Sequence, residues 1–400
     1  MRERLPEHVR LAPGTATPRR RVALLIEATR SYARGLIRGV ARYNREHRGW
    51  SIHFMPQGLG EPPPKWLPNW RGDGILARID DRQMAEAVLA TGLPVVEMRR
   101  LHLDLGLPTI GPDHRAVAQL AAEHLRQRGF QQFGFCCSPR GSHPTTDALA
   151  ESFVQSLARV GRPCKVLYLP RGRRTSPGED QLDAIRKWLM RLPKPLGVMA
   201  CNDDRALQVL EACRRSGFRV PDEVAVVGAG NDDCLCNLAL PSLTSVDLNP
   251  QRIGYEAAEL LDRLMLGERA PQAHTLVEPR GIAMRLSTDV LATDDQAVVK
   301  AISFIREHAC ERIQVADVFR HAKMSRAALE PRFKAALGRT VYQEVQRVRV
   351  ERVKQLLADT DLPLKQVAHR AGFQYTEYMM RVFRRATGQT AKQYREDNRS

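Results

Sequence analysis

The sequence predicts a chain of two parts, a large α/β domain followed by a small all-α domain. Through residue 290, short apolar runs alternate with amphipathic stretches of roughly ten to fifteen residues. Strands that alternate with helices of this length are typical of βαβ units and a parallel sheet. Beyond residue 290 only helical patterns remain, and one helical motif occurs there twice.

Each expected strand is a short apolar run, and each expected helix has apolar residues recurring at helical spacing. We expect strands at Val22–Glu27, Trp50–Met55, Gly74–Ile79, Pro94–Met98, Phe133–Cys137, Lys165–Leu169, Gly197–Ala200, Val224–Gly228 and Thr275–Pro279. We expect helices at Tyr32–Tyr43, Met84–Ala90, Val117–Arg128, Ala148–Val160, Asp180–Leu192, Asp204–Ser216 and Arg252–Leu266. Residues 1–20 are basic and polar and should form a flexible arm, so domains are predicted at 21–290 and 291–400.

The duplicated motif spans Val315–Val345 and Leu364–Arg395. Val315, Val318, Ala322 and Met324 match Leu364, Val367, Ala371 and Phe373 at an offset of 49, while Phe333, Gly338 and Thr340 match Phe383, Gly388 and Thr390 at an offset of 50. The change of offset predicts one extra residue in the second unit, between Phe373 and Phe383. Each unit has a short helix, a turn and a second helix with a polar outer face, which is the pattern of a helix-turn-helix. Two such units predict binding of double-stranded DNA.

The two units and the helix between them, with the sequences RVRVERVKQLLADT and AGFQYTEYMMRVFRRATGQTAKQYR, resemble the DNA-binding module of the AraC/XylS family. The resemblance implies that base-reading side chains come from the second helix of each unit. The candidates are Arg326, Ala327 and Glu330 in the first unit, and Thr376, Glu377, Tyr378 and Arg381 in the second. The first unit departs from the family pattern at Phe319, Lys323 and Pro331. Because proline weakens a helix interior, we expect the second unit to carry most of the base reading.

Composition agrees with a polyanionic partner and excludes several classes of protein. The formal net charge is +17 and the sequence pI is about 9.9. The eight cysteines form no CxxC pair, so neither a zinc site nor a disulfide framework is predicted. No signal peptide and no apolar run of about twenty residues occurs, so we expect a cytoplasmic protein with no membrane partner.

A dinucleotide-binding enzyme is the main rival for the α/β domain. Such an enzyme needs a glycine-rich phosphate turn after the first strand, but the sequence there is EATRSYARG, with the single glycine Gly35. P-loop, nucleophile-elbow and metal-ligand patterns are also absent from the sequence. Neither an enzyme nor a cofactor is therefore predicted.

Three segments of the α/β domain, Pro108–Cys137, Leu196–Asp233 and Leu240–Glu268, resemble the sensor domain of the LacI/periplasmic-binding-protein type. Followed by an AraC-type module, this order resembles the family of xylose operon regulators. The resemblance implies a two-lobed periplasmic-binding-protein-like domain, followed by the all-α double helix-turn-helix domain, with a ligand between the lobes. One lobe is expected at residues 20–128 and 245–270, and the other at 130–244.

The resemblance also implies which residues face the ligand. They are Ser31, Tyr32 and Arg34 after the first strand, Arg140 after the fifth, and Asn202 and Asp203 after the seventh. Gly230 and Leu149 stand where the family usually has sugar-contacting Asp and Arg, and Asn231, Asp232 or Arg140 could substitute for them. We expect Asp203 to be the main polar anchor; the alternative is that it only caps the helix that follows.

Together these features predict a sequence-specific transcription regulator controlled by a small effector, possibly xylose or a related sugar. A homodimer is expected, with RNA polymerase as a further partner if the protein is an activator. An alternative left open by Gly230 and Leu149 is a constitutive DNA-binding protein whose sensor domain is only a dimerisation scaffold.

Overall fold

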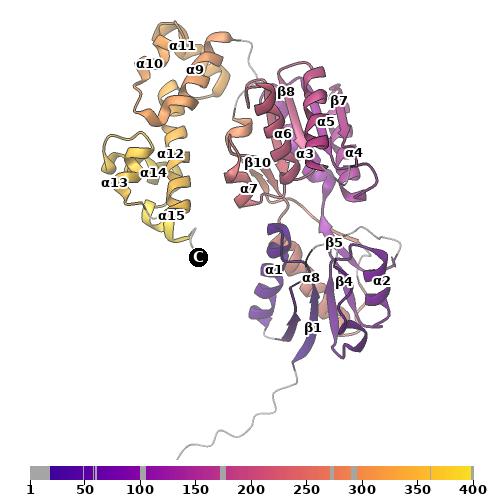
Figure 1. The fold of residues 1–400 in the computed structure, drawn as a ribbon. Coiled ribbons are helices and arrows are strands. Elements are labelled where there is room, and N and C mark those ends of the chain that lie inside the picture. The colour runs from indigo at the N-terminus through magenta and orange to yellow at the C-terminus, as the bar shows by residue number, and fades with distance from the viewer. Residues whose placement is uncertain are drawn as a thin grey trace, which may run out of the picture.

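The computed structural model describes residues 19–47, 49–56, 58, 61–99, 105–171, 177–270, 274–289, 295–360 and 362–397. An α/β region with two sheets is followed by a region made of helices, so the predicted fold class is confirmed (Figure 1). Residues 1–18 of the predicted flexible arm lie outside the described residues, and Arg20 already belongs to the first strand.

Every expected strand and helix overlaps an element of the structure. The strands are β1 (Arg20–Leu25), β2 (Trp50–Phe54), β3 (Gly74–Ala77), β4 (Val95–Glu97), β5 (Thr109–Pro112), β6 (Gln132–Cys137), β7 (Cys164–Tyr168), β8 (Leu196–Ala200), β9 (Val224–Ala229), β10 (Thr244–Asp247), β11 (His274–Val277) and β12 (Gly281–Ala283). The helices of the α/β region are α1 (Ser31–His47), α2 (Arg82–Leu89), α3 (His114–Gln127), α4 (Pro144–Ala158), α5 (Pro177–Arg191), α6 (Asp203–Ser216), α7 (Asp233–Leu238) and α8 (Pro250–Met265), with 3-10 turns η1 (Leu67–Asn69) and η3 (Leu286–Thr288). The helical region contains α9 (Gln296–His308), η4 (Ala309–Glu311), α10 (Val315–His321), α11 (Arg326–Leu337), α12 (Val341–Asp359), α13 (Leu364–Arg370), α14 (Thr376–Thr387) and α15 (Ala391–Asp397).

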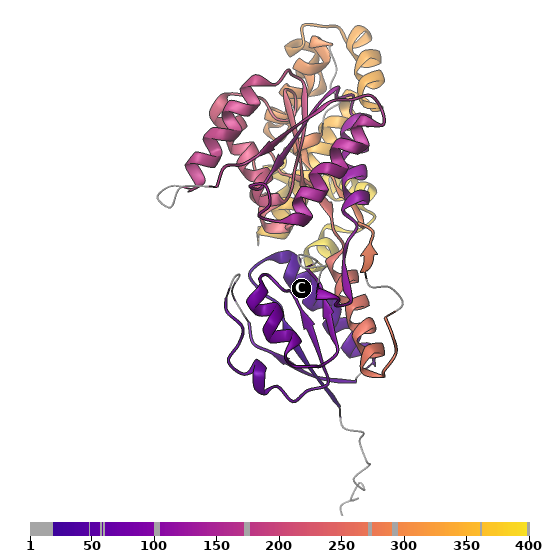
Figure 2. The ribbon, with the colours of Figure 1, turned by 90° about the vertical axis from the view of Figure 1, so that its right-hand side faces the viewer.

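Two six-stranded sheets define two lobes. The first lobe has the strand order β11-β5-β4-β3-β1-β2, and the second has β12-β10-β9-β8-β6-β7. All pairings are parallel except that of β12 with β10. The chain crosses between the lobes three times: after β5, after β10 and after β11 (Figures 1 and 2). A ligand at the carboxyl ends of these strands would therefore lie between two bodies joined by three segments.

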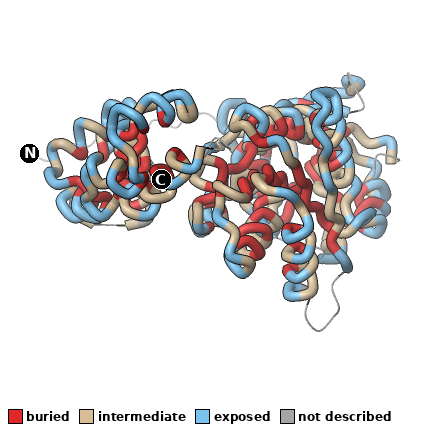
Figure 3. The backbone as a smooth tube through the Cα atoms, turned by 90° about the horizontal axis from the view of Figure 1, so that it is seen from above, coloured by how far each residue is buried: buried red, intermediate tan, exposed pale blue. Residues whose placement is uncertain are grey.

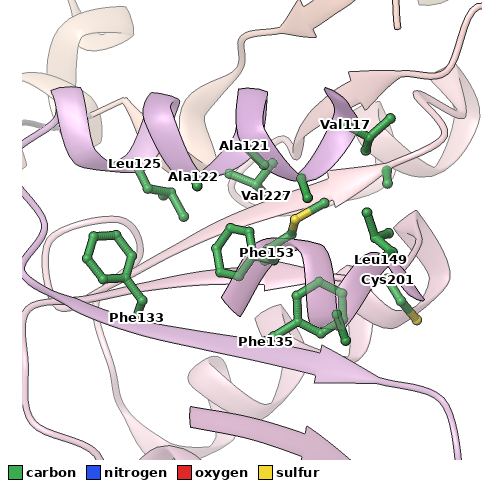
Figure 4. Close-up of a cluster of buried hydrophobic side chains, with 14 of the residues drawn as sticks. Val117, Ala121, Ala122, Leu125, Phe133, Phe135, Leu149, Phe153, Cys201 and Val227 are labelled. Atoms are coloured by element: carbon green, nitrogen blue, oxygen red, sulfur yellow. The ribbon is translucent and has the colours of Figure 1, made fainter. Parts of the chain in front are cut away.

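Helix α3 belongs to the second lobe, so the predicted boundary at residue 128 is wrong. Val117, Ala121 and Leu125 of α3 share one buried cluster with Phe133 and Phe153 of the second lobe (Figure 4). The apolar stripe of α3 covers the second sheet, and the crossing occurs at the end of β5 instead. Helical periodicity shows that α3 buries a face, but it does not show against which sheet.

The helical region contains buried residues of its own (Figure 3), and the two predicted helix-turn-helix units, α10–α11 and α13–α14, each have a separate buried core. Phe333 and Phe383, matched in the repeat, are both fully buried, one in each core. The long helix α12 joins the units and contributes Val345 to the first core and Val353 to the second. The turn in the first unit occupies residues 322–325 and that in the second 371–375, so the extra residue lies in the turn.

The turn of the first unit contains a lysine in left-handed conformation. Lys323 has φ +53°, and the glycine that matches it at an offset of 49, Gly372, has φ +80°. A side chain raises the energy of this backbone conformation by roughly 1–2 kcal/mol. We therefore expect Lys323→Gly to raise the free energy of unfolding of the helical region by about 1 kcal/mol. Urea unfolding followed by circular dichroism checks this, with Lys323→Ala as the control that removes the charge but keeps the strain. An equal effect of both variants would contradict the backbone explanation.

Candidate functional site

A cavity of about 760 Å³ lies where the two lobes meet. The first lobe lines it with residues of α1 between Ser31 and Arg42 and with residues of α8, and the second lobe with the loop after β9 and with Asp247 at the end of β10. The crossing segments contribute Asn249 and Arg280. A cavity with both lobes in its wall changes shape whenever the lobes move relative to each other, which suits a sensor.

Three of the predicted ligand residues line this cavity: Ser31, Tyr32 and Asn231. Ser31 and Tyr32 open helix α1, and Asn231 lies in the loop after β9 with φ +52°. Gly230 also lines the cavity. These residues come from two segments far apart in the sequence, α1 and the loop after β9, and the fold brings them together at the carboxyl ends of β1 and β9.

Four other predicted residues have partners away from this cavity. Arg34 is exposed and donates to the backbone carbonyl oxygens of Ala28 and Thr29 at 3.0 and 2.8 Å. Arg140 is exposed, with its guanidinium 5.4 Å from the ring centroid of Tyr168. Asn202 and Asp232 act as N-caps of α6 and α7: their side-chain oxygens accept from Arg205 N and Leu235 N. None of the four belongs to the cavity lining, so their ligand contacts stay a prediction.

Asp203 is buried inside the second lobe and holds the loop after β9. Its Oδ1 accepts from Ser245 Oγ at 2.5 Å, and its Oδ2 accepts from Asp232 N at 2.8 Å. Burial raises the pKa of this carboxyl group. The alternative that Asp203 caps α6 is wrong, because Asn202 is the cap and Asp203 is the first helical residue. Its role as the ligand anchor stays a prediction.

The absence of a side chain at Gly230 is explained by Asp203. A Cβ atom built on Gly230, which has φ +134°, would lie 3.0 Å from Asp203 Oδ2. Leu149, the second departure from the family pattern, is fully packed in the core of the second lobe (Figure 4). Neither position therefore offers a polar group to the cavity.

Sequence reasoning missed a group of charged residues at the carboxyl ends of the first-lobe strands. Glu27 follows β1, Arg78 and Asp80 follow β3, and Glu97 and Arg99 lie at the end of β4. Glu27 is ion-paired with Arg78, and Asp80 is ion-paired with Arg99. Glu97 is almost fully buried and accepts from the backbone N–H groups of Ile79 and Arg99. The sequence did contain a signal for this group, because a charged residue stands at the end of each of these apolar runs.

This charged group adjoins the cavity through Tyr32. The guanidinium of Arg78 lies 5.4 Å from the centroid of the Tyr32 ring. Burial raises the pKa of Tyr32 to about 12, so its hydroxyl stays protonated at neutral pH. The buried Oε2 of Glu27 and Nε of Arg78 have no hydrogen-bond partner among the described residues. One buried acceptor and one buried donor of this ion pair are thus without a hydrogen-bond partner among the described residues.

In the helical region, α11 and α14 turn polar side chains outward. Arg326, Ala327 and Glu330 line a shallow surface hollow on α11 together with Pro331, and α11 continues through this proline. Arg381 lines a second hollow on α14. Pro331 lies inside α11 as the sequence indicated, and it has no N–H to donate to the helix.

The first turn of α14 holds the remaining predicted DNA contacts. Thr376 begins the helix and Glu377 is exposed. Tyr378 is half-buried: its ring lies 5.2 Å from the guanidinium of Arg381, and its hydroxyl is hydrogen-bonded to that of Tyr342 on α12. Tyr378 thus ties the second recognition helix to the helix that joins the two units, and its base contact stays a prediction.

Within the described parts of the chain, no group of three or more His, Cys, Asp or Glu side chains is placed to hold a metal ion. A search of the same residues finds no helix that combines the length and the apolar character needed to cross a membrane.

Comparison with family models divides the chain in the same order as the structure. Residues 21–101 match the XylR N-terminal domain, residues 122–288 a periplasmic binding protein-like domain, and residues 318–397 a helix-turn-helix domain. The third match contains both recognition helices, α11 and α14. It leaves out only residues 315–317, at the start of the first unit.

Similarity to curated proteins extends over nearly the whole chain. The xylose operon regulatory protein of Escherichia coli (strain K12) is 31% identical over 389 residues, 96% of this chain and 98% of that protein. The protein of the same name from Haemophilus influenzae is 30% identical over 384 residues, 94% of this chain and 98% of its own length.

Solved structures agree with this assignment. The structure of a xylose-binding transcription activator, xylR, is 29% identical, has a TM-score of 0.74 and covers 96% of this chain and 99% of its own. The transcription regulator CcpA of Lactococcus lactis, at 17% identity and a TM-score of 0.56 over 68% of this chain, shares the fold of the α/β region. The chain belongs to the family of xylose operon regulatory proteins, which are DNA-binding transcription regulators.

Proposed function

We propose that this protein switches transcription of carbohydrate-utilisation genes in response to a sugar bound between its lobes, with xylose or a related pentose as the first candidate. One observation carries the proposal: an interlobe cavity and two outward-facing recognition helices occur on one chain whose relatives, matched end to end, are named for the xylose operon. The scaffold-only alternative is not favoured, because a pure dimerisation domain needs no cavity lined by both lobes.

The polar groups around the cavity support a polyhydroxylated effector. A hydroxyl group both donates and accepts hydrogen bonds, so it can pair with the polar side chains of Asn231, Asp233 and Asp247 in the cavity lining. Tyr32 also lines the cavity, and its ring lies beside the guanidinium of Arg78. The family resemblance implies polar sugar contacts at the positions of Gly230 and Leu149, but neither residue has a polar side chain. The proposed effector is therefore xylose or a related pentose.

We further propose that the regulator works as a homodimer in the cytoplasm and contacts RNA polymerase. Dimerisation would place recognition helices on two half-sites of an operator. The polymerase contact is proposed because the solved relative is named a transcription activator.

The proposed function is tested with the full-length chain and double-stranded fragments from upstream of its own and adjoining genes. We expect binding at least about a thousandfold tighter than to random DNA, by fluorescence anisotropy at fixed salt. D-xylose, L-arabinose and D-ribose are then added separately. At least one should raise the melting temperature and change the affinity for DNA. If none changes either quantity, sugar control is ruled out for these pentoses while DNA binding is judged by the first measurement alone.

Base reading by the second unit is tested at Arg381. We expect Arg381→Ala to lose about 1–3 kcal/mol of binding free energy and to relax specificity at one or two base pairs. Arg326→Ala should have a smaller effect, because Pro331 and the strained Lys323 disturb the first unit. Arg352→Ala is the charge-matched control, since Arg352 is exposed on α12. Larger losses from Arg326→Ala than from Arg381→Ala, in competition assays with substituted operators, would reverse the assignment.

A further inference from the structure

The helical region docks on the second lobe through two aspartates. Asp222, before β9, accepts from Ser303 Oγ at 2.9 Å and from Arg306 Nη1 at 3.3 Å. Asp289, after η3, is ion-paired with Arg339 at 3.4 Å and with Arg347 of α12. All six residues are charged or polar groups drawn from both regions, so the docking is specific in direction and position.

The docking around Asp289 reaches into the body of the helical region. Glu344 of α12 is fully buried and ion-paired with both Arg339 and Arg347. A movement of Asp289 therefore shifts two guanidinium groups that are also held by a buried carboxylate on α12. Since α12 joins the two helix-turn-helix units, its position sets how the two recognition helices are spaced.

Four residues before Asp289, Arg285 contacts the wall of the effector cavity. Its Nη2 donates to Asn231 Oδ1 at 3.0 Å, and its guanidinium lies 3.6 Å from the carboxylate of Asp233. Asn231 and Asp233 both line the interlobe cavity. Its Nη1 donates to Leu243 O at 3.0 Å, which fixes the arginine to the second sheet.

The residues between these two ends are held rigidly. Ser287 and Thr288 of η3 are fully buried. Ser287 Oγ donates to Val226 O at 2.6 Å and accepts from Thr244 N at 2.8 Å. Arg128 Nε donates to Thr288 O at 2.7 Å. A short segment with this many fixed contacts moves as a unit and does not absorb a displacement at one end.

We propose that residues 285–289 form a strut that carries the state of the effector cavity to the DNA-binding region. Arg285 is the positioning residue at the cavity end, and Asp289 is the contact at the other end. An effector that moves Asn231 or Asp233 alters the hold on Arg285, and the strut then alters the Asp289 contacts with α12. This inference rests on the proposed function for its biological meaning, but the coupling itself exists in the protein without effector or DNA.

Reciprocal hydrogen exchange in the full-length chain tests the strut. Arg285→Met removes the guanidinium and leaves Asp289 in place, and it should speed exchange at the start of α12, residues 341–350, about fivefold. Arg347→Met, made at the other end, should speed exchange in residues 230–233 by a similar factor, because coupling between two sites is reciprocal. Arg280→Met is the matched control: Arg280 is exposed and lines the same cavity, and among the described residues it donates only its backbone N–H, to Asp247 O.

Two outcomes would overturn the strut. One is faster exchange that stays within residues 231–245 and 284–288 in Arg285→Met while α12 is unchanged, which would make Arg285 a local support only. The other is an equal change of α12 in Arg280→Met. If Arg285→Met does not fold, Asn231→Gly removes the accepting amide and suits the φ of +52°, and it must give the same change at α12. Because the readout uses neither sugar nor DNA, failure of the strut is distinguished from failure of the proposed function.

Discussion

Gly372→Ala is expected to unfold the second helix-turn-helix unit and to abolish specific DNA binding. Gly372 has φ +80°, which a side chain disfavours by roughly 1–2 kcal/mol. A Cβ atom there would also lie 2.6 Å from Ala309 O and 2.8 Å from Cys310 Cα. These are backbone atoms of η4, and Arg349 Nε of α12 donates to the same Ala309 O at 2.8 Å. Since η4 cannot withdraw without breaking that bond, we expect a total loss of more than about 3 kcal/mol.

Gly388→Ala is the matched control for this prediction. Gly388 ends α14 with φ +76°, and no atom lies within 4 Å of a Cβ built on it. The Gly388→Ala variant should therefore lose only about 1–2 kcal/mol of its free energy of unfolding, from the left-handed backbone conformation, and should keep measurable DNA binding. Thermal unfolding by circular dichroism and anisotropy with operator DNA separate the two variants. Equal losses would show that the approach of Gly372 to η4 contributes nothing.

Acid is expected to destabilise the protein through His124. Arg128 Nη1 lies 3.0 Å from His124 Nδ1, and because arginine only donates, Nδ1 must be the acceptor. The proton is then on Nε2, which donates to Thr288 Oγ1 at 2.9 Å. Burial and the neighbouring Arg128 lower the pKa of His124 to about 3. A pKa below the usual 6.5 means that the neutral form stabilises the fold, and this contribution is lost as pH falls from 6.5 towards 3, by up to roughly 4 kcal/mol.

Urea unfolding between pH 7.5 and pH 4 checks the contribution of His124. His124→Gln keeps a donor near Thr288 but cannot take up a proton in this range. We expect it to be less stable than the natural sequence at pH 7.5 by about 1–2 kcal/mol, with a smaller loss on acidification. His369→Gln, at an exposed histidine of α13, should leave the pH dependence unchanged. If His124→Gln follows the same pH profile as the natural sequence, other groups cause the acid effect.

The helical region could be predicted closely because the repeat is a property of the sequence itself. The change of offset between Phe373 and Phe383 required an extra residue, and the structure places it in the turn of the second unit. Apolar residues that recur at helical spacing predict a helix from the sequence alone, whatever surface the helix packs against. Lys323 in left-handed conformation also follows from its match with Gly372.

The strands that join the lobes could not be found in the same way. β5, β10 and β12 have only three or four residues, and β5 contains both glycine and proline. Such segments have too few apolar residues to show a period, and their pairing is decided by distant parts of the chain. The same limit explains the wrong lobe for α3, whose apolar stripe fits either sheet.

The sequence predicts a site residue well when the residue reaches the site simply by following a strand. It predicts less well when the direction of the side chain decides whether the residue reaches the site. Tyr32 and Asn231 line the cavity because they follow β1 and β9. Asp203 also follows a strand, but its carboxylate turns inward to Ser245 and the N–H of Asp232. Ser245, the residue that draws the carboxylate inward, lies on another strand, so the sequence around Asp203 does not reveal this contact. Glu27 and Arg78 were missed because a charged residue at a strand end is usually solvent-exposed.

The three crossings between the lobes have a consequence for how the protein is made. Helix α8 packs on α1 yet follows it by about two hundred residues, and the second sheet gains β12 only at Gly281–Ala283. On a ribosome that adds about 5–20 residues per second, the first lobe cannot be complete until β11 has emerged at Val277, and the second lobe cannot be complete until β12 has emerged at Ala283. The helical region is one continuous stretch and needs no such wait. Nascent chains stopped before Pro250 would expose the apolar face of α1, so chaperone binding should concentrate there during synthesis.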